Sequence, residues 1–198
     1  MIKTYNIFTI YQLPNRIVTD TKLQTLQYKI LNNIIPCRAK LFHWKIADTD
    51  RCNYCGAHDS LSHFLYRCEV SKRFWRQLIN WIENSFKLQI DLSIIDIIFG
   101  IKGTKGLLLN LNYFILYGKQ FIYWHRIEQK DLFLLEFLNE LKQNLIVEKF
   151  RHAMNDNLKE FSKNWTMFYP FFLKTLPKHQ HYNLHHHHSS PVLYIKRK

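Results

Sequence analysis

The sequence predicts a mainly α-helical fold, in which a small module of three cysteines and one histidine is embedded between helices. Apolar residues recur at intervals of three and four along several segments, and one compact run of metal-ligand residue types interrupts them. We expect a helical segment carrying this module at 1–99, a C-terminal helical region at 107–173 and a disordered tail at 174–198.

The first helix is predicted to end just before Pro36, which cannot continue a helix. Its start is marked by Thr19-Asp20-Thr21, whose side chains can accept hydrogen bonds from the free backbone N–H groups of the first turn. The apolar positions that define its buried face are Leu23, Leu26, Ile30, Leu31 and Ile34.

The embedded module is the pattern C-x2-C-x7-H-x4-C formed by Cys52, Cys55, His63 and Cys68. Two thiolates three positions apart on a tight turn can reach one ion, and one turn of helix would bring His63 and Cys68 to the same side. Zn²⁺ prefers four such ligands in a tetrahedron. Three thiolates and one imidazole leave no position for an activated water, so we predict a closed, structural zinc site.

Two alternatives for this pattern stay open. The cysteines can be ordinary buried residues with His63 at the surface. His58 can also replace His63 as a ligand, since it follows Cys55 by three positions, although so short a chelate crowds the turn.

A second amphipathic helix follows the module. Its apolar face is predicted to contain Phe74, Leu78, Ile79, Ile82 and Phe86, with Lys72, Arg73, Arg76 and Gln77 on the polar side. Gly100, Gly103 and Gly106 then form a break, interpreted as a linker because the spacing of a phosphate-binding Walker loop is absent.

Two further helices are expected after this break. Residues 107–125 are rich in Leu, Phe and Tyr, but Asn110, Asn112 and Lys119 interrupt them, so we predict a buried helix rather than a membrane span. A long helix should begin near Asp131. Its apolar side would either complete the fold or dock another part of a polymerase, and contains Leu135, Leu138, Leu141, Leu145, Phe150 and Met154.

The final stretch changes character at Pro177. His179, His181 and the run 185–188 bind soft metals, but low-complexity sequence offers no fixed geometry, so we expect disorder rather than a built metal site.

Positive charge is concentrated at both ends of the chain. Residues 1–80 contain 12 basic and five acidic residues, a net charge of +7, whereas 81–170 have a net charge of +1 and 171–198 of +5. Such a potential attracts a polyanion and gains from counterion release. Nucleic acid, either RNA or DNA, is therefore the predicted partner, although lysines that only solvate helix faces would give the same composition.

The predicted nucleic-acid contacts lie around the zinc module, which would hold them in fixed positions. The basic ones are Arg38, Lys40, Lys45, Arg51, Arg67, Lys72, Arg73 and Arg76. Aromatic residues between them can stack on unpaired bases; Tyr54 is the foremost candidate, and the others are Phe42, Trp44, Tyr66, Phe74 and Trp75.

These motifs together resemble the zinc-binding region at the C-terminal end of LINE-type (non-LTR) retrotransposon reverse transcriptases. The resemblance is carried by 27–36, which ends at a proline, by the Cys-Cys-His-Cys cluster, and by Phe74-Trp75 shortly after the last cysteine. It implies a module that helps a polymerase hold template RNA or target DNA, with the polymerase portion of a parent polyprotein as a possible second partner.

Catalysis is not predicted. Reverse transcriptases bind catalytic metal through adjacent aspartates, and this chain contains none; the polymerase would lie upstream or be lost. No signal peptide or disulfide framework is evident, and we expect an intracellular, reducing compartment, either nucleus or cytoplasm. The alternative function is a zinc-stapled structural or protein-interaction module that binds no nucleic acid.

Overall fold

The computed structural model describes residues 7–170, which form a helical fold with no β-strand in this range. The predicted mainly α fold is confirmed, while the predicted disordered tail at 174–198 lies outside the described residues. The elements are α1 (Ile7–Ile17), α2 (Thr21–Leu31), α3 (Arg38–His43), the π-helical turn η1 (His63–Arg67), α4 (Glu69–Phe86), α5 (Ile94–Phe99), α6 (Gly106–Ile127), α7 (Leu134–Met154) and α8 (Leu158–Trp165).

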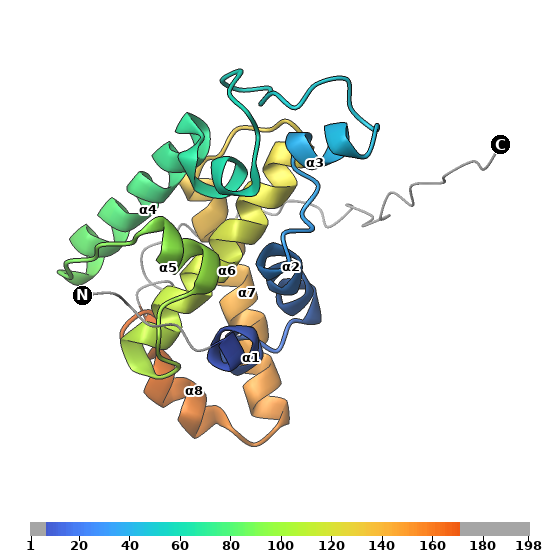
Figure 1. The fold of residues 1–198 in the computed structure, drawn as a ribbon. Coiled ribbons are helices and arrows are strands. Elements are labelled where there is room, and N and C mark those ends of the chain that lie inside the picture. The colour runs from blue at the N-terminus through green and yellow to red at the C-terminus, as the bar shows by residue number, and fades with distance from the viewer. Residues whose placement is uncertain (1–6, 171–198) are drawn as a thin grey trace, which may run out of the picture.

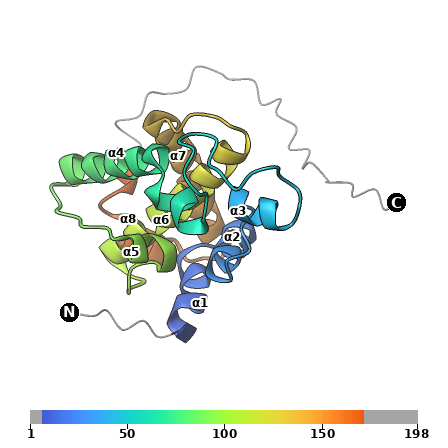
Figure 2. The ribbon, with the colours of Figure 1, turned by 45° about the horizontal axis from the view of Figure 1, so that its top comes forward.

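Helix α6 is the centre of the fold. It contacts α1, α2, η1, α7 and α8, and Figures 1 and 2 show α4 on one side of the α6–α7 pair with α1 and α2 on the other. Most of its side chains between Leu109 and Arg126 are buried, so the prediction of a buried helix is confirmed. None of the described helices has the length and apolar character needed to cross a membrane.

A single hydrophobic core joins the two ends of the described chain. Leu23 and Trp75, from the segment before the glycine-rich break, belong to the same buried cluster as Phe114, Leu141 and Phe168 from the segment after it. The residues before and after the glycine-rich break therefore pack into one core. The predicted division into segments 1–99 and 107–173 stays a prediction.

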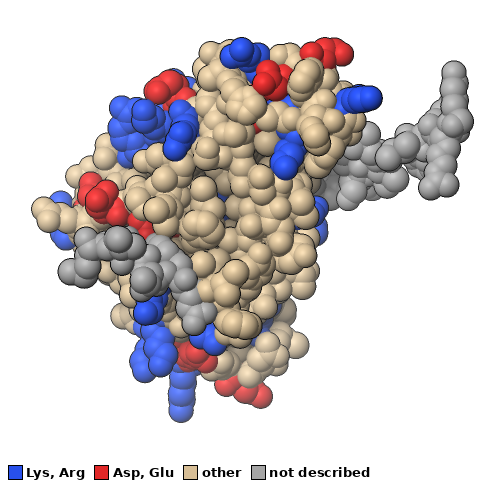
Figure 3. Space-filling view, in the orientation of Figure 1, with Lys and Arg blue, Asp and Glu red and all other residues tan. Residues whose placement is uncertain are grey.

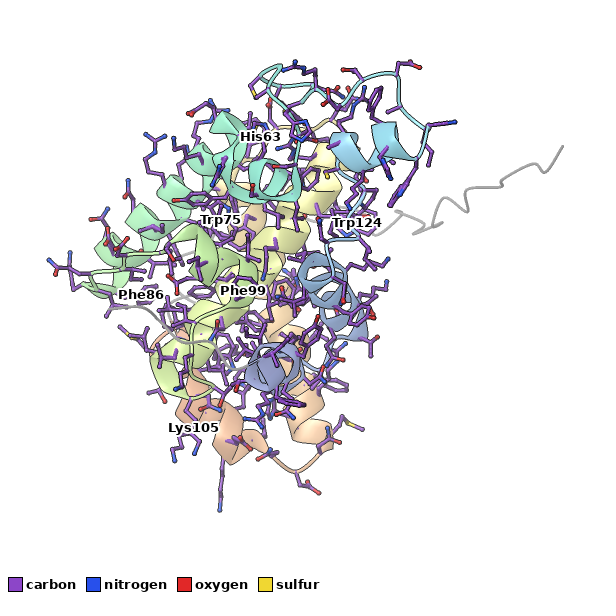
Figure 4. The ribbon with its side chains drawn as sticks, viewed as in Figure 1. His63, Trp75, Phe86, Phe99, Lys105 and Trp124 are labelled. Carbon is purple, nitrogen blue, oxygen red and sulfur yellow. The ribbon has the colours of Figure 1, made fainter. Side chains whose placement is uncertain are left out.

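The Trp75 side chain of α4 packs directly against Gly118 of α6. A Cβ atom placed there would lie 2.6 Å from the Trp75 ring, so only glycine admits the indole. Trp75 also donates from Nε1 to the Leu65 carbonyl at 2.8 Å, and Phe74 stacks on Phe121. In Figure 4, Trp75 lies below His63, toward the middle of the molecule. The Phe-Trp pair thus connects the module to the core.

Several predicted helix features are confirmed. Asp20 caps α2, its carboxylate accepting from Lys22 N at 2.8 Å. On α4, Phe74, Leu78 and Ile82 are buried. The residues of the predicted polar side are exposed: Lys72, Arg73, Arg76 and Gln77.

The predicted apolar side of α7 is partly wrong. Leu138, Leu141 and Leu145 are buried as expected, but Leu135, Phe150 and Met154 are 58%, 64% and 70% exposed. At 100° per residue, Phe150 and Met154 lie on the side of the helix opposite Leu141 and Leu145. Glu148, three positions after Leu145, lies on the buried side and accepts hydrogen bonds from Thr19 and Arg151. The predicted stripe therefore departs from helical spacing after Leu145.

The glycine-rich segment between α5 and α6 is fastened to the fold by Asn112. Its side-chain oxygen accepts from Ile101 N at 2.7 Å, and its Nδ2 donates to the carbonyls of Ile101 and Gly103. The polar residues that interrupt the apolar sequence of α6 thus hold neighbouring backbone in place.

Lys119 is the second such interruption, and it is 1% exposed. Its ammonium donates to the side-chain oxygen of Gln27 and to the carbonyl of Ile98. Burial of the charge lowers the pKa of Lys119 to about 7. The unfolded chain therefore binds more protons than the folded chain between about pH 7 and the ordinary lysine pKa, and this residue makes the protein more stable as pH rises through that window.

We expect Lys119→Met to remove this dependence. The difference in free energy of unfolding between wild type and variant should shift by about 3 kcal/mol in favour of wild type from pH 6 to pH 9. Urea titrations at both values measure it, and other titrating groups cancel in the comparison. A difference that stays constant with pH would show that Lys119 titrates normally.

Candidate zinc site

The turn that carries Cys52 and Cys55 is closed by its own backbone. Gly56 N donates to Cys52 O at 2.9 Å, and Cys52 N donates to Ala57 O at 2.7 Å. Gly56 has φ +71°, a left-handed conformation that costs other residues energy. The turn therefore presents both sulfur atoms to one side.

The second pair of donors is arranged by η1. Cys68 N donates to His63 O at 2.9 Å, five residues back, so one π-helical turn separates His63 from Cys68. Both are buried. The one helical turn expected between them is present.

The four predicted residues meet in space. One donor atom from each of Cys52, Cys55, His63 and Cys68 lies within 4.8 Å of the others, with 3.8 Å between the sulfurs of Cys52 and Cys68 and 3.3 Å between Cys55 Sγ and His63 Nε2. A tetrahedral zinc ion has sulfur–sulfur edges of about 3.8 Å and slightly shorter sulfur–nitrogen edges. The donor set and its dimensions fit zinc.

His58 is not part of this cluster. Its Nδ1 lies 2.7 Å from a carboxylate oxygen of Asp50, on an exposed part of the turn. The geometry thus favours His63 over the alternative ligand.

The pKa values of Cys52 and His63 are shifted toward the metal-binding forms, whereas that of Cys68 is shifted toward the neutral thiol. Burial raises the pKa of the Cys52 thiol, but hydrogen bonds from the backbone of Tyr54 and Cys55 and the charge of Arg126 outweigh it, so the net pKa falls. Burial raises the pKa of Cys68 to about 11, and the neighbouring Cys52 adds to the rise. Burial lowers the pKa of His63. A metal ion would allow both thiolates to form beside a neutral imidazole.

Arg126 of α6 is buried against the cluster. Its Nη2 lies 3.2 Å from Cys52 Sγ and 3.1 Å from Asp59 Oδ1, and its Nη1 lies 3.0 Å from Phe64 O and 3.4 Å from Ser71 Oγ. Figures 1 and 2 show the segment between α3 and α4 crossing the upper end of α6. Arg126 thus fixes the module to the central helix and supplies positive charge to the thiolates.

Asp59 is the partner of this arginine and is 1% exposed. Besides the bond from Arg126, its Oδ2 accepts from Arg38 N at 3.0 Å, which ties the start of α3 to the cluster. Sequence analysis identified neither Arg126 nor Asp59 as part of the site. No local pattern marks an ion pair whose partners are separated by more than sixty positions.

A cavity of about 150 Å³ lies beside the cluster. Its walls include Arg38, Asn53, Tyr54 and Arg126. The buried Nε atoms of Arg38 and Arg126 have no hydrogen-bond partner. The cavity is thus lined by polar and apolar residues and includes the predicted nucleic-acid contacts Arg38 and Tyr54.

The predicted basic contacts surround the cluster. Lys45, Arg51, Arg67, Lys72, Arg73 and Arg76 are exposed, and Arg38 and Lys40 are half-buried. In Figure 3, basic side chains gather over the upper part of α4. Their role as nucleic-acid contacts, like that of the four cluster residues as zinc ligands, stays a prediction.

The aromatic candidates divide into two groups. Phe74 and Trp75 are each 1% exposed and unavailable to a base, while Phe42 and Trp44 are 50% and 46% exposed. Tyr54 is half-buried; its hydroxyl donates to the Lys130 carbonyl at 3.2 Å and its ring faces the Arg126 guanidinium. Tyr54 thus holds the turn against the end of α6.

Comparison with known proteins gives one family. No curated protein and no solved structure matches this chain. Arg126 and the helices from α5 onward lie outside the region that the family model covers. Residues 6–75, which contain all four residues of the cluster, match the family described as zinc-binding in reverse transcriptase.

Proposed function

We propose that this chain is a non-catalytic, zinc-dependent nucleic-acid-binding module. The observation that carries the proposal is the exposed basic surface around the cluster. Arg67 directly precedes Cys68, and Lys72, Arg73 and Arg76 follow it on the first turns of α4. A zinc ion bound by the cluster would fix these side chains relative to one another, and preorganisation reduces the entropy lost on gripping a strand.

The exposed aromatics favour a single strand. Phe42 and Trp44 lie at the end of α3, near Lys40 and Lys45 in the sequence. Aromatic rings beside basic residues form the stacking surfaces on which proteins hold unpaired bases. We therefore place the bases at the end of α3 and the phosphates along α3, the cysteine turn and the start of α4.

The family match supports an origin in a reverse transcriptase, and we propose the LINE type on the motifs described above. In that setting the module would hold template RNA or target DNA while a separate polymerase portion performs the chemistry. The predicted zinc shell is filled by protein ligands, so the ion would hold structure and activate no water.

Arg73 and Arg76 provide the first test. We expect the double substitution to alanine to weaken single-stranded RNA binding about five- to tenfold and to reduce the slope of log affinity against log salt by about 1.4. Fluorescence anisotropy across a salt series measures both.

The matched control removes two lysines from α8. Lys159→Ala with Lys163→Ala makes the same change in net charge at exposed positions outside the family match. An equal loss of RNA affinity in the two double variants would mean that binding depends only on net charge. That result would contradict the proposed binding surface on α4.

Trp44 provides a test independent of charge. Because stacking contributes about 1–3 kcal/mol per base, Trp44→Ala should weaken single-stranded RNA binding at least about fivefold at unchanged salt slope. Phe150→Ala on α7, which removes an aromatic side chain that is 64% exposed, should leave the affinity unchanged. Wild-type affinity in the Trp44 variant would place the bases elsewhere.

The alternative function is a protein-interaction module, and one observation favours it. Leu135, Phe150 and Met154 form exposed apolar surface on α7, which would suit the missing polymerase portion as a partner. Salt separates the two functions, since apolar docking does not weaken steeply as salt rises, whereas strand binding does.

A further inference from the structure

A second group of metal-ligand residue types lies between α6 and α7. His125 of α6 and Glu136 and Glu140 of α7 bring one donor atom each within 4.8 Å of one another. Glu136 and Glu140 are four positions apart, so both lie on the same side of their helix. Neither the family match nor the zinc prediction includes any of the three.

His125 is held in the orientation that a metal ligand requires. Its Nδ1 lies 3.0 Å from the Phe121 carbonyl, and its ring packs on the Phe121 ring with centroids 3.8 Å apart. A neutral imidazole that donates from Nδ1 has its lone pair on Nε2. Ligating histidines almost always use this arrangement, with a carbonyl fixing the other nitrogen.

The Nε2 atom of His125 is buried and has no hydrogen-bond partner. The imidazole is 9% exposed, and the nearest charged oxygen, Glu136 Oε1, lies 3.4 Å from Nε2. A buried polar atom without a partner requires an explanation. Here it is directed at two carboxylates, which together carry two negative charges beside it.

We infer that His125, Glu136 and Glu140 bind a divalent first-row transition-metal ion, separate from the cysteine cluster. One imidazole nitrogen and two carboxylate oxygens suit Zn²⁺ or Mn²⁺, whereas the thiolate-rich cluster selects zinc. The ion replaces the missing partner of Nε2 and offsets the paired carboxylates. The nearby Lys130 does not neutralise these two carboxylates, because its ammonium is paired with Glu128 at 2.6 Å.

Such an ion would join α6 to α7 at the end of α6 that carries Arg126. Glu136 and Glu140 are exposed, so the remaining coordination positions face solvent and accept water or a phosphate oxygen. Because the ion binds the folded chain, it stabilises that state in proportion to its occupancy.

The test uses the whole chain, loaded with one equivalent of Zn²⁺, which the thiolate-rich cluster takes, and then titrated with Mn²⁺. Manganese favours carboxylate oxygen and binds histidine-rich sequence such as 179–188 weakly, and its unpaired electrons broaden nearby amide resonances. We expect binding to broaden the amides around 125, 136 and 140 and to raise the melting temperature. Glu136→Gln and Glu140→Gln, nearly isosteric changes at exposed positions, should each weaken binding at least about tenfold.

Glu160→Gln on α8 is the matched control and should bind Mn²⁺ as wild type does. Two results would overturn the site: broadening confined to other regions, or the same affinity in the Glu136 and Glu140 variants as in the control. A thermal shift by Mn²⁺ that persists in both variants would equally assign the stabilisation to another site.

Discussion

Cys68→Ser is expected to abolish cooperative folding of the zinc module. Structural zinc supplies on the order of 10 kcal/mol of folding free energy in small modules, comparable with the whole stability of a domain. Cys68 is fully buried at the start of α4, and η1 and α4 share the core with α6 and α7. The loss should therefore spread beyond the module and reach the packing of Trp75. Near-ultraviolet circular dichroism during thermal melting measures it.

Cys37→Ser is the matched control for this substitution. Cys37 is 2% exposed but lies outside the cluster, so serine there should cost only about 1–2 kcal/mol. A Cys68 variant that melts like wild type, or no later than the Cys37 variant, would contradict the zinc site.

Arg126→Met is expected to produce the second largest effect. It would leave the buried Asp59 carboxylate without its charged partner and remove positive charge from the thiolate of Cys52. Breaking a buried ion pair from one side costs about 3–5 kcal/mol, which corresponds to a fall of about 10 °C in melting temperature for a chain of this size. Arg126→Lys should recover little, because an ammonium cannot reach all four acceptors.

A double-mutant cycle identifies the cause. If the loss of stability comes from the unpaired Asp59 carboxylate, the two changes should not be additive. Asp59→Asn combined with Arg126→Met should then lower the free energy of unfolding by at least about 1 kcal/mol less than the sum of the single changes. Additive costs would mean that Arg126 stabilises the fold through its other contacts.

The longer helices α4, α6 and α7, the start of α2 and the cluster could be predicted because their signals are local, whereas α1, α3, α5 and α8 were not predicted. The cap at Asp20 and the spacing of the cysteines each depend on a few neighbouring residues, and the structure reproduces them. The predicted helix end just before Pro36 is wrong: α2 ends at Leu31, Asn33 takes a left-handed conformation with φ +53°, and Ile34 is 45% exposed. The preference for His63 over His58 required three-dimensional information, since both have plausible spacing. His63 lies with the three cysteines, while His58 contacts Asp50.

The support of the site could not be predicted because it depends on distant parts of the chain. Arg126 reaches Cys52 across 74 positions, and Thr19 reaches Glu148 across 129. The second contact holds Glu148 on the buried side of α7, where it is 3% exposed. Sequence alone predicts a glutamate to be exposed. The half-buried position of Tyr54 could not be predicted for a similar reason, because its contact with Lys130 is not visible in the sequence.

The most direct test of the proposed function is the affinity of the zinc-loaded chain for single-stranded RNA and for duplex DNA across a salt series, beside a metal-stripped sample. We predict tight binding whose log affinity falls with log salt at a slope of about −3 or steeper, and which disappears without zinc. Weak binding that is insensitive to both salt and zinc would contradict the proposal and leave the cluster as a structural staple.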